Sequence, residues 1–245
     1  MDRRGSEQAQ ADPGALFFES LRLVAGLAAG VVVVGLAANW GLDIENNLYA
    51  KLSVGPLIVS IAGAVYFATC VDSAGPEIGA APGQRGAWPE SPRSFVETTK
   101  AVLLATAVLI VGSMLITQIV ELLGLRVEEQ ESIVELTKPV GGSINPAVFI
   151  LAPMAVLAAP LFEELLFRGL YFRRLLGKVG ALPAFVASSI AFAAIHGNPS
   201  GVPVYLLQAV IFGGVYRYTG RISAAIAVHF LNNAITLAVL VSGLG

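Results

Sequence analysis

Charged side chains are scarce in this chain of 245 residues, since only 13% are Asp, Glu, Lys or Arg. Soluble domains carry about 25% charged residues, whereas 56% of this chain is hydrophobic and its mean hydropathy is +0.75. A soluble fold of this length could not bury that much apolar surface. The composition also lacks the low hydrophobicity and high charge of disordered chains. It therefore predicts an integral membrane protein with several spanning helices.

The lack of excess basic charge and of cysteines excludes two further classes of function. The net charge is −2, so the chain has no excess of basic residues for binding nucleic acid. Its one cysteine, Cys70, can form neither an intrachain disulfide nor a thiolate metal cluster. From residue 147 onward the only acidic residues are Glu163 and Glu164, and both histidines, His196 and His229, lie in the same stretch. The ionisable chemistry of this apolar region is therefore concentrated in a few side chains.

Seven apolar segments are expected to be helices, because the runs are continuous rather than alternating and only helices and closed barrels satisfy the backbone in lipid. They span residues 21–38, 52–71, 101–123, 147–170, 182–196, 202–216 and 222–241. The fifth and sixth are shorter than the roughly 17–25 residues of a spanning helix, so we expect half-buried or tilted helices there. The predicted fold is an all-α, polytopic membrane bundle of about seven transmembrane helices.

The chain divides into a polar tail at residues 1–20, a variable N-terminal part at 21–123 and a C-terminal core at 147–241. A Gly- and Pro-rich linker is expected at about 74–93. The polar tail and the many later apolar segments make the start unlike a secretory signal. Basic loops alternate with acidic ones, and basic loops tend to be cytoplasmic. We therefore expect a multi-pass protein of the cell membrane with a cytoplasmic N-terminus.

Charged side chains in the membrane are candidates for function, because each costs at least about 2.5–3.5 kcal/mol on insertion scales. Glu164 and Arg168 are four residues apart, so they share a helix face and can pair. Glu163 is turned away from Glu164 by about 100° and is left free to point into a cavity. The alternative interpretation of this motif is a charged turn at a helix end.

Two other polar motifs follow on later segments. Phe192 and His196 are four residues apart, so the phenyl ring can back the imidazole, and His229 and Asn233 share a face of the last segment. A satisfied histidine at a helix end and a polar contact between helices are the alternative interpretations. A rise of about 1.5 Å per residue allows these groups and Glu163 to reach a similar depth, nearer the cytoplasmic face.

Carboxylates, imidazoles and an amide are the groups needed by an amide hydrolase that uses water directly. A carboxylate or imidazole can act as the general base, and an imidazole or amide N–H can stabilise an oxyanion. No nucleophile stands out, because Cys70 is remote and Ser188 and Ser189 lack an obvious base.

A zinc site is the chemical alternative to direct activation of water by a carboxylate. Its ligands would be Glu163, His196 and His229. The sequence His-Glu-x-x-His is absent, and Asn233 would be a poor zinc ligand. We therefore expect no required cofactor, with zinc as the alternative.

Three motifs occur in order on successive apolar segments, and together they resemble one family. They are Glu163-Glu164-x-x-x-Arg168, Phe192-x-x-x-His196 and His229-x-x-x-Asn233. This pattern is similar to that of the CAAX protease and bacteriocin-processing (Abi) family of intramembrane proteases, which includes the type II CAAX prenyl endopeptidases. The resemblance covers residues 147–240 approximately.

The resemblance implies a role for each matching residue. Glu163 would be the general base that activates water, assisted by His196. His229 and Asn233 would stabilise the oxyanion. The remaining catalytic-motif positions are Glu164 and Arg168, for which we expect a structural ion pair.

The resemblance also implies an intramembrane endopeptidase that acts on a membrane-associated peptide or protein. The CAAX reaction of the family removes the last three residues after a prenylated cysteine, so a lipidated substrate is one expectation. The expected partners are this substrate and the lipid bilayer, without nucleic acid. The alternatives are a non-catalytic scaffold or immunity factor of the same fold, or a small-solute or proton transporter. A transporter predicts a two-fold internal repeat, and none is visible.

Overall fold

The computed structural model describes residues 13–71, 92–128 and 131–243. Within these ranges the protein is an all-α, polytopic membrane bundle, as the composition predicts. Six helices of the described residues are long and apolar enough to cross a membrane, and they span Gly14–Asn39, Leu48–Cys70, Phe95–Leu122, Ala147–Val179, Pro199–Thr219 and Ile222–Ser242. A shorter apolar helix covers Ala181–Ala194. The linker expected at 74–93 lies almost wholly outside the described residues.

The described elements are α1 (Pro13–Asn39), α2 (Leu48–Val71), α3 (Phe95–Leu122), α4 (Glu131–Thr137), α5 (Ala147–Pro153), η1 (Met154–Ala158), α6 (Ala159–Glu164), η2 (Leu165–Phe172), α7 (Arg173–Val179), α8 (Ala181–Ala194), η3 (Pro199–Gly201), α9 (Val202–Thr219) and α10 (Ile222–Ser242). From α5 to α10 they follow one another along the chain with few residues between them, whereas longer connections precede α2, α3, α4 and α5. The elements η1 and η2 are π-helical and η3 is a 3₁₀ turn. The segment from α5 to α7 is thus one long helix interrupted by two π-helical stretches.

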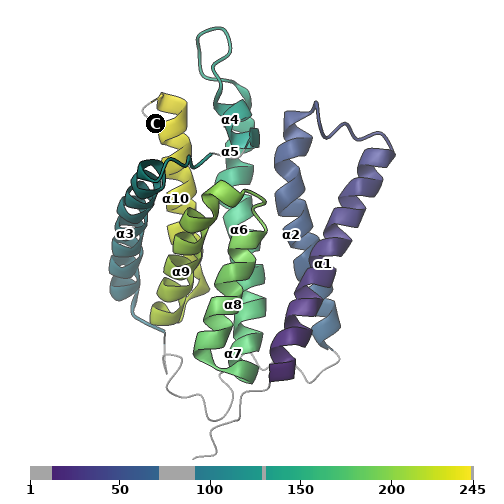
Figure 1. Cartoon of the computed structure of the whole chain (residues 1–245), viewed down its shortest axis with the longest axis vertical. Helices are drawn as coiled ribbons and strands as arrows, with labels where there is room; N and C mark the ends of the chain where they lie inside the picture. The colour runs from purple at the N-terminus through teal and green to yellow at the C-terminus, as the bar shows by residue number, and fades with distance from the viewer. Residues whose placement is uncertain (1–12, 72–91, 129–130, 244–245) are drawn as a thin grey trace, which may run out of the picture.

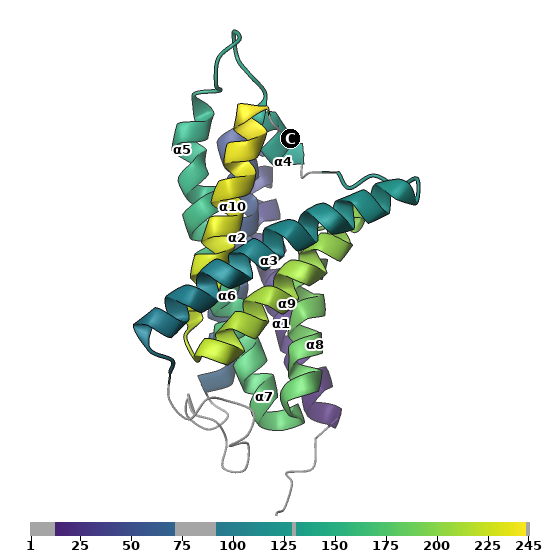
Figure 2. The same ribbon diagram turned by 90° about the vertical axis from the view of Figure 1, so that its left-hand side faces the viewer.

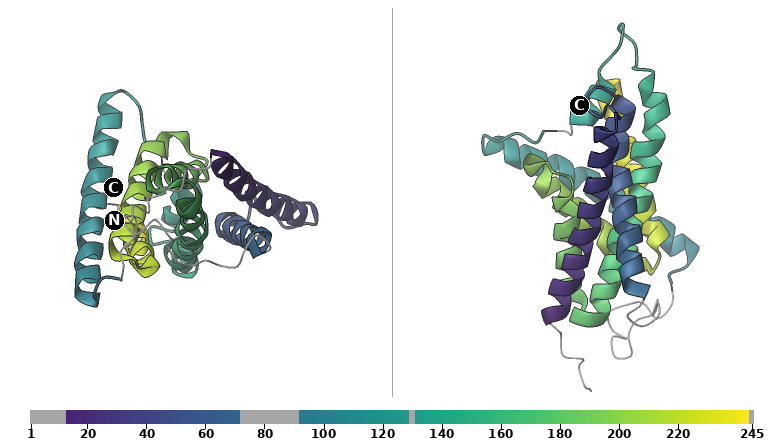
Figure 3. Two further views of the ribbon diagram at one scale, coloured as in Figure 1. Left: turned by 90° about the horizontal axis from the view of Figure 1, so that it is seen from below. Right: turned by 90° about the vertical axis from the view of Figure 1, so that its right-hand side faces the viewer.

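Figure 1 shows the elements as roughly upright helices around this long interrupted helix. The hairpin of α1 and α2 lies on one side, and α8, α9 and α10 lie on the other (Figure 3). Helix α3 is strongly tilted and packs across α9 and α10, on the face far from the hairpin (Figure 2). The main apolar core forms where the interrupted helix meets α8, α9 and α10, and it includes Phe167, Phe172, Phe192, Phe212 and Val228.

The outer helices present large apolar side chains to their surroundings. On α3, Leu104 is 67% exposed and Met114 is 60% exposed, and on α1 Val32 is 59% exposed. Contiguous apolar surface of this kind is unfavourable in water but suits the hydrocarbon of a bilayer.

Helix α1 begins at Pro13 rather than at residue 21, because a carboxylate inside the expected polar tail is buried. Glu19 is fully buried, and its Oε1 accepts hydrogen bonds from Arg174 Nε at 2.9 Å and from Lys178 Nζ. Its Oε2 accepts a hydrogen bond from the Tyr66 hydroxyl at 2.6 Å. These contacts fasten α1 to α2 and α7, so residues 13–20 belong to the helix.

The sixth expected segment is longer than predicted, and only the fifth is short. Helix α9 continues from residue 216 to Thr219 and ends at Gly220, whose φ of 68° is the left-handed cap that glycine adopts readily. With the preceding turn η3 it reaches the length of a membrane span. Helix α4 was not predicted, because its seven residues lie in a polar, acidic connection.

Proline explains one interruption of the long helix. Pro160 has no N–H to donate, and the N–H of Ala159 bonds to Met154 O, five residues back. The usual four-residue pairing between Ala159 N–H and Ala155 O is therefore not made. Ala155 O is released for a side-chain donor from a neighbouring helix.

Candidate active site

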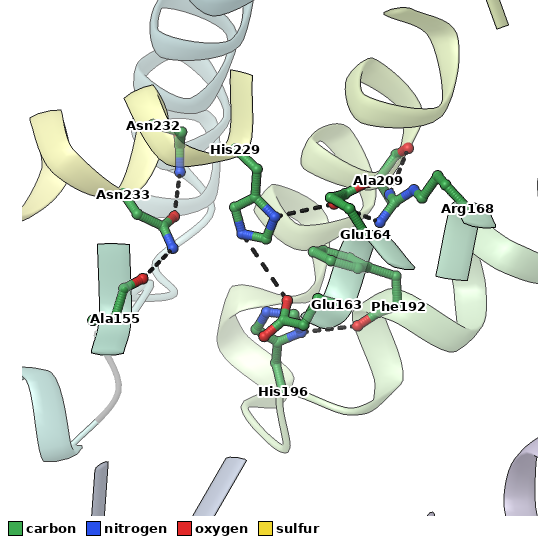
Figure 4. A network of polar contacts seen from close by, with 10 residues as sticks. All are labelled: Ala155, Glu163, Glu164, Arg168, Phe192, His196, Ala209, His229, Asn232 and Asn233. Atoms are coloured by element: carbon green, nitrogen blue, oxygen red, sulfur yellow. Dashed lines mark hydrogen bonds and ion pairs between the residues drawn. The ribbon is translucent and has the colours of Figure 1, made fainter. Parts of the chain in front are cut away.

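A cavity of about 760 Å³ lies among α6, α8, α9 and α10 and extends to α1, α2 and α3. Its wall includes Glu163, His196, His229 and Asn233. The structure therefore brings these predicted site residues to one cavity, from α6, from α10 and, for His196, from the turn that follows α8 rather than from the expected helical segment. Figure 4 shows their polar contacts: His229 links Glu163 to Glu164 and Arg168, whereas His196 contacts Phe192 and Asn233 contacts Ala155 and Asn232.

Glu164 and Arg168 form a buried ion pair beside the cavity. Arg168 Nη1 donates to Glu164 Oε1 at 2.9 Å, and Nη2 donates to Ala209 O at 3.1 Å. The guanidinium also lies over the Phe192 ring, with Cζ 4.5 Å from the ring centroid. Both charged side chains are almost completely buried. Because i,i+4 residues share a helix face, this pair holds the helix turn that also carries Glu163.

Glu163 is turned into the cavity. Its Oε2 is buried and has no hydrogen-bond partner within the described residues. The same atom lies 4.0 Å from His229 Nε2, which is too long for a direct hydrogen bond. One water molecule can bridge two polar atoms at this separation. Buried polar atoms in proteins are normally hydrogen-bonded. A carboxylate oxygen without a protein partner in a cavity is therefore a candidate for binding water or for a catalytic role.

His229 is held from both sides. Its Nδ1 lies 3.0 Å from Glu164 Oε1, and its ring stacks on Phe212 with centroids 4.4 Å apart. Because an ionised carboxylate only accepts hydrogen bonds, Nδ1 carries the proton and Nε2 is directed towards Glu163. The successive contacts from Arg168 to Glu164 and from Glu164 to His229 thus fix both the orientation and the tautomer of this imidazole.

His196 is oriented by a different route. Its Nδ1 lies 2.8 Å from Phe192 O, and a carbonyl oxygen only accepts, so Nδ1 is the protonated nitrogen. The neutral ring therefore keeps an accepting lone pair on Nε2. The ring stacks on Tyr205 with centroids 4.1 Å apart, and Phe192 backs it at 4.8 Å.

The predicted amide, Asn233, is anchored to the π-helical stretch. Its Nδ2 donates to Ala155 O at 2.9 Å, the carbonyl released by the interrupted helix. Its Oδ1 accepts from Asn232 Nδ2 at 3.2 Å. Each amide NH₂ group has two hydrogens, so one N–H of each asparagine remains beyond these bonds. Both asparagines line the cavity.

The zinc alternative requires its three expected ligands to surround one ion. No group of three or more His, Cys, Asp or Glu side chains converges as metal ligands within the described residues. His229 Nε2 is 4.0 Å from Glu163 Oε2. Zinc–nitrogen and zinc–oxygen bonds are about 2 Å long, so an ion between these two atoms would be bonded to them in a nearly straight line. Zinc sites are tetrahedral instead. The expected ligands Glu163, His196 and His229 therefore do not form a zinc site as arranged.

Ser188 has a structural role. Its Oγ donates to Phe167 O at 3.0 Å in the core, between α8 and η2. Its hydroxyl is therefore committed to holding two helices together.

A family-model comparison finds a similarity in the C-terminal part of the chain. Residues 145–235 match the family model described as "Type II CAAX prenyl endopeptidase Rce1-like". The resemblance to the CAAX protease family is confirmed over this segment. The matched residues include all three polar motifs, and they run from the start of the long interrupted helix into α10.

One curated CAAX protease matches part of the chain. The membrane-embedded CAAX protease MroQ of Staphylococcus aureus (strain USA300) is 35% identical over 80 residues, which are 30% of this chain and 32% of that protein. The chain therefore matches about a third of the length of this relative. No solved structure matches the chain.

Sequence reasoning missed several residues that shape the site. Tyr205 stacks on His196 and Phe212 stacks on His229, but an aromatic residue in an apolar helix carries no signal of its own. Asn232 had a usable signal, because it is a second amide next to Asn233 in a membrane segment.

Proposed function

We propose that this protein is an intramembrane endopeptidase in which Glu163 activates a water molecule to hydrolyse a peptide bond. The observation that carries the proposal is the buried, unpartnered Oε2 of Glu163, which faces His229 across 4.0 Å in a cavity that His196 also lines. The family match over residues 145–235 supports a membrane protease. The substrate is a membrane-associated peptide or protein, and the CAAX reaction makes a prenylated one the first to test.

In the proposed reaction one proton moves from the water to Glu163 and then to the leaving nitrogen. The water oxygen attacks the carbonyl carbon of the scissile bond, and Glu163 takes the proton that the water loses. His196 assists by accepting a hydrogen bond from the water at Nε2. The negative charge on the tetrahedral oxygen is stabilised by Asn233 and by His229, whose Nε2 carries the proton of the cluster while Glu163 acts as the base. The proton then passes from Glu163 to the leaving nitrogen as the C–N bond breaks.

Charge balance supports a proton shared between Glu163 and His229. The two carboxylates Glu163 and Glu164 exceed the one fixed cation, Arg168, by one charge. A single proton on Glu163 or on His229 Nε2 neutralises the cluster, which favours it in a low-dielectric site. We propose that no metal takes part, because the carboxylate and imidazoles supply both the base and the electrostatic stabilisation.

The test is cleavage by purified protein reconstituted in liposomes. Two quenched fluorescent peptides serve as substrates, one with an S-farnesylated cysteine followed by three residues and one with the same cysteine unmodified. Glu163→Gln removes only the basic oxygen, so we expect the rate to fall by roughly a thousandfold, and His229→Ala to fall similarly. The exposed Glu121→Gln is the matched control and should cleave like the wild type.

Mass spectrometry locates the cleaved bond, and the assay is repeated with a strong chelator. Undiminished cleavage with the chelator is the expected result, and its loss would contradict the metal-independent mechanism. Equal cleavage by Glu163→Gln and the wild type would overturn the proposed function. Cleavage of neither peptide by the wild type would favour the non-catalytic scaffold.

A further inference from the structure

The cavity extends well beyond the segment that matches the CAAX protease family, and helix α3 contributes to its wall. Ser113 and Thr117 of α3 line the cavity together with Gln208 of α9. Ser113 Oγ is buried, and none of these three side chains has a hydrogen-bond partner within the described residues. Polar groups in a membrane protein are normally paired, since lipid offers them no partner.

The same helix supplies the contrast. Hydroxyl side chains in helices commonly bond to the carbonyl four residues back, and Thr106 does so, with Oγ1 donating to Val102 O at 2.9 Å. Thr99 makes the same bond to Phe95 O at 3.0 Å. Ser113 on the same helix makes no such bond. The hydroxyls that face the cavity are therefore the ones left available.

Packing explains why these residues reach the cavity. A Cβ at Gly112 would lie 2.8 Å from Leu207 Cδ2, so the absence of a side chain at Gly112 makes room for the end of the Leu207 side chain between α3 and α9. The neighbours of this contact pair in sequence are Ser113 and Gln208, and both line the cavity. Gln208 is also three residues after Tyr205, which stacks on His196. Side chains with polar groups therefore line the cavity from His196 and Tyr205 along α9 to Gln208, and from there to Ser113 of α3.

The opposite wall has a different character. Apart from Lys51, the hairpin of α1 and α2 contributes mainly apolar side chains to the same cavity, including Leu23, Leu27, Val31, Ile58 and Val59. A chain bound in the cavity would thus meet hydrogen-bonding groups on one side and apolar side chains on the other. In an extended peptide the backbone N–H and C=O groups point in different directions from the side chains, so the backbone can meet one of these walls while apolar side chains meet the other.

We propose that Ser113, Thr117 and Gln208 bind the extended backbone of the peptide next to the scissile bond. The inference rests on the proposed function and names a binding subsite for it. Residues four apart on a helix are separated by about 6 Å along its axis. Backbone groups that face the same way in an extended peptide repeat at about 6.6 Å. The hydroxyls of α3 therefore match alternate backbone groups of the bound chain.

The test compares KM and kcat for variants that keep side-chain volume. Combining Ser113→Ala, Thr117→Val and Gln208→Leu should raise KM by about tenfold or more, because each hydrogen bond contributes a factor of a few, while kcat changes by less than about twofold. Thr106→Val removes a paired hydroxyl on the same helix and should leave KM unchanged. Thr117→Ser keeps the hydroxyl and should retain the wild-type KM.

A modified peptide shows whether the effect arises from backbone contacts. N-methylation of the alternate peptide nitrogens next to the scissile bond should raise KM for the wild type but add little in the triple variant. Thermal unfolding in detergent checks that all variants fold. A triple variant with the KM of Thr106→Val, or additive effects of N-methylation and substitution, would overturn the subsite.

A binding measurement separates this inference from the proposed function. The farnesylated peptide, labelled with a fluorophore, is titrated with protein in detergent, and its anisotropy gives Kd without cleavage. Weaker binding by the triple variant supports the subsite even where no cleavage occurs. Equal binding by the wild type and the triple variant, or binding by neither, overturns the subsite. Cleavage that depends on Glu163 would leave the proposed function standing in either case.

Discussion

At the scale of single residues, two adjacent carboxylates have different surroundings. Glu164 is fully buried and is compensated by Arg168 and by His229. Glu163 differs in direction by one helical step, and this alone turns it from the ion pair into the cavity. The sequence predicted both the pair and the direction, because a spacing of four residues fixes which carboxylate can reach the arginine.

Arg168→Leu is expected to destabilise the protein strongly. The substitution leaves Glu164 buried without its cation, and breaking a buried pair from one side costs about 3–5 kcal/mol. The midpoint of thermal unfolding in detergent should fall well below that of the wild type. Arg126→Leu removes an exposed arginine and serves as the control. Equal midpoints for the two variants would contradict a bracing role for the pair.

At the scale of elements, two glycines set the contact between α1 and α2. A Cβ at Gly26 would lie 2.8 Å from Ala62 O, and a Cβ at Gly30 would lie 2.8 Å from Ile58 O. Glycines four residues apart permit close approach of membrane helices. This spacing is visible in the sequence, and it could have predicted that α1 packs against another helix.

Gly30→Leu should therefore disturb the hairpin. The new side chain would overlap the backbone of α2, and overpacking typically costs about 1–3 kcal/mol. Gly35→Leu is the matched control on the same helix, because a Cβ there meets nothing within 4 Å. Thermal unfolding of both variants in detergent is the measurement. An unfolding midpoint as low for Gly35→Leu as for Gly30→Leu would show that the close contact is not the cause.

The hydrogen bond at the interruption of the long helix could not be predicted from the periodic pattern of the sequence. Pro160 indicated a local disturbance, but the sequence did not show which carbonyl would be released or which side chain would take it. The structure assigns Ala155 O to Asn233 at 2.9 Å, across 78 positions of the chain. A contact of this kind depends on how α10 packs against η1.

At the scale of the whole molecule, basic side chains predominate at one end of the described part of the chain and acidic side chains at the other, although Glu19 pairs with Lys178 at the first end and Lys51 pairs with Glu135 at the second. Arg221 Nε donates to Arg93 O at 2.9 Å at the end that also contains α7 with Lys178 (Figure 1). The connections at the other end contain Asp43 and Glu128, between α1 and α2 and before α4. By the distribution of basic residues, we propose that the first end is cytoplasmic.

Cysteine labelling tests this orientation. In a Cys70→Ala background, Asp43→Cys should react with a membrane-impermeant maleimide on intact cells. Arg221→Cys should react only after the membrane is permeabilised. The opposite pattern would contradict a cytoplasmic N-terminus, because α1 crosses once between the two ends.

The sequence by itself determined the membrane class, the helical fold and the three polar motifs, because hydropathy and residue spacing are local properties of the chain. It also determined the Glu164–Arg168 pairing, which lies within one helix. Only the tertiary structure decided that His229 bonds to Glu164, that Tyr205 stacks on His196 and that α3 lends hydroxyls to the cavity. These contacts join residues far apart in the chain, so they depend on helix packing, which local spacing does not encode.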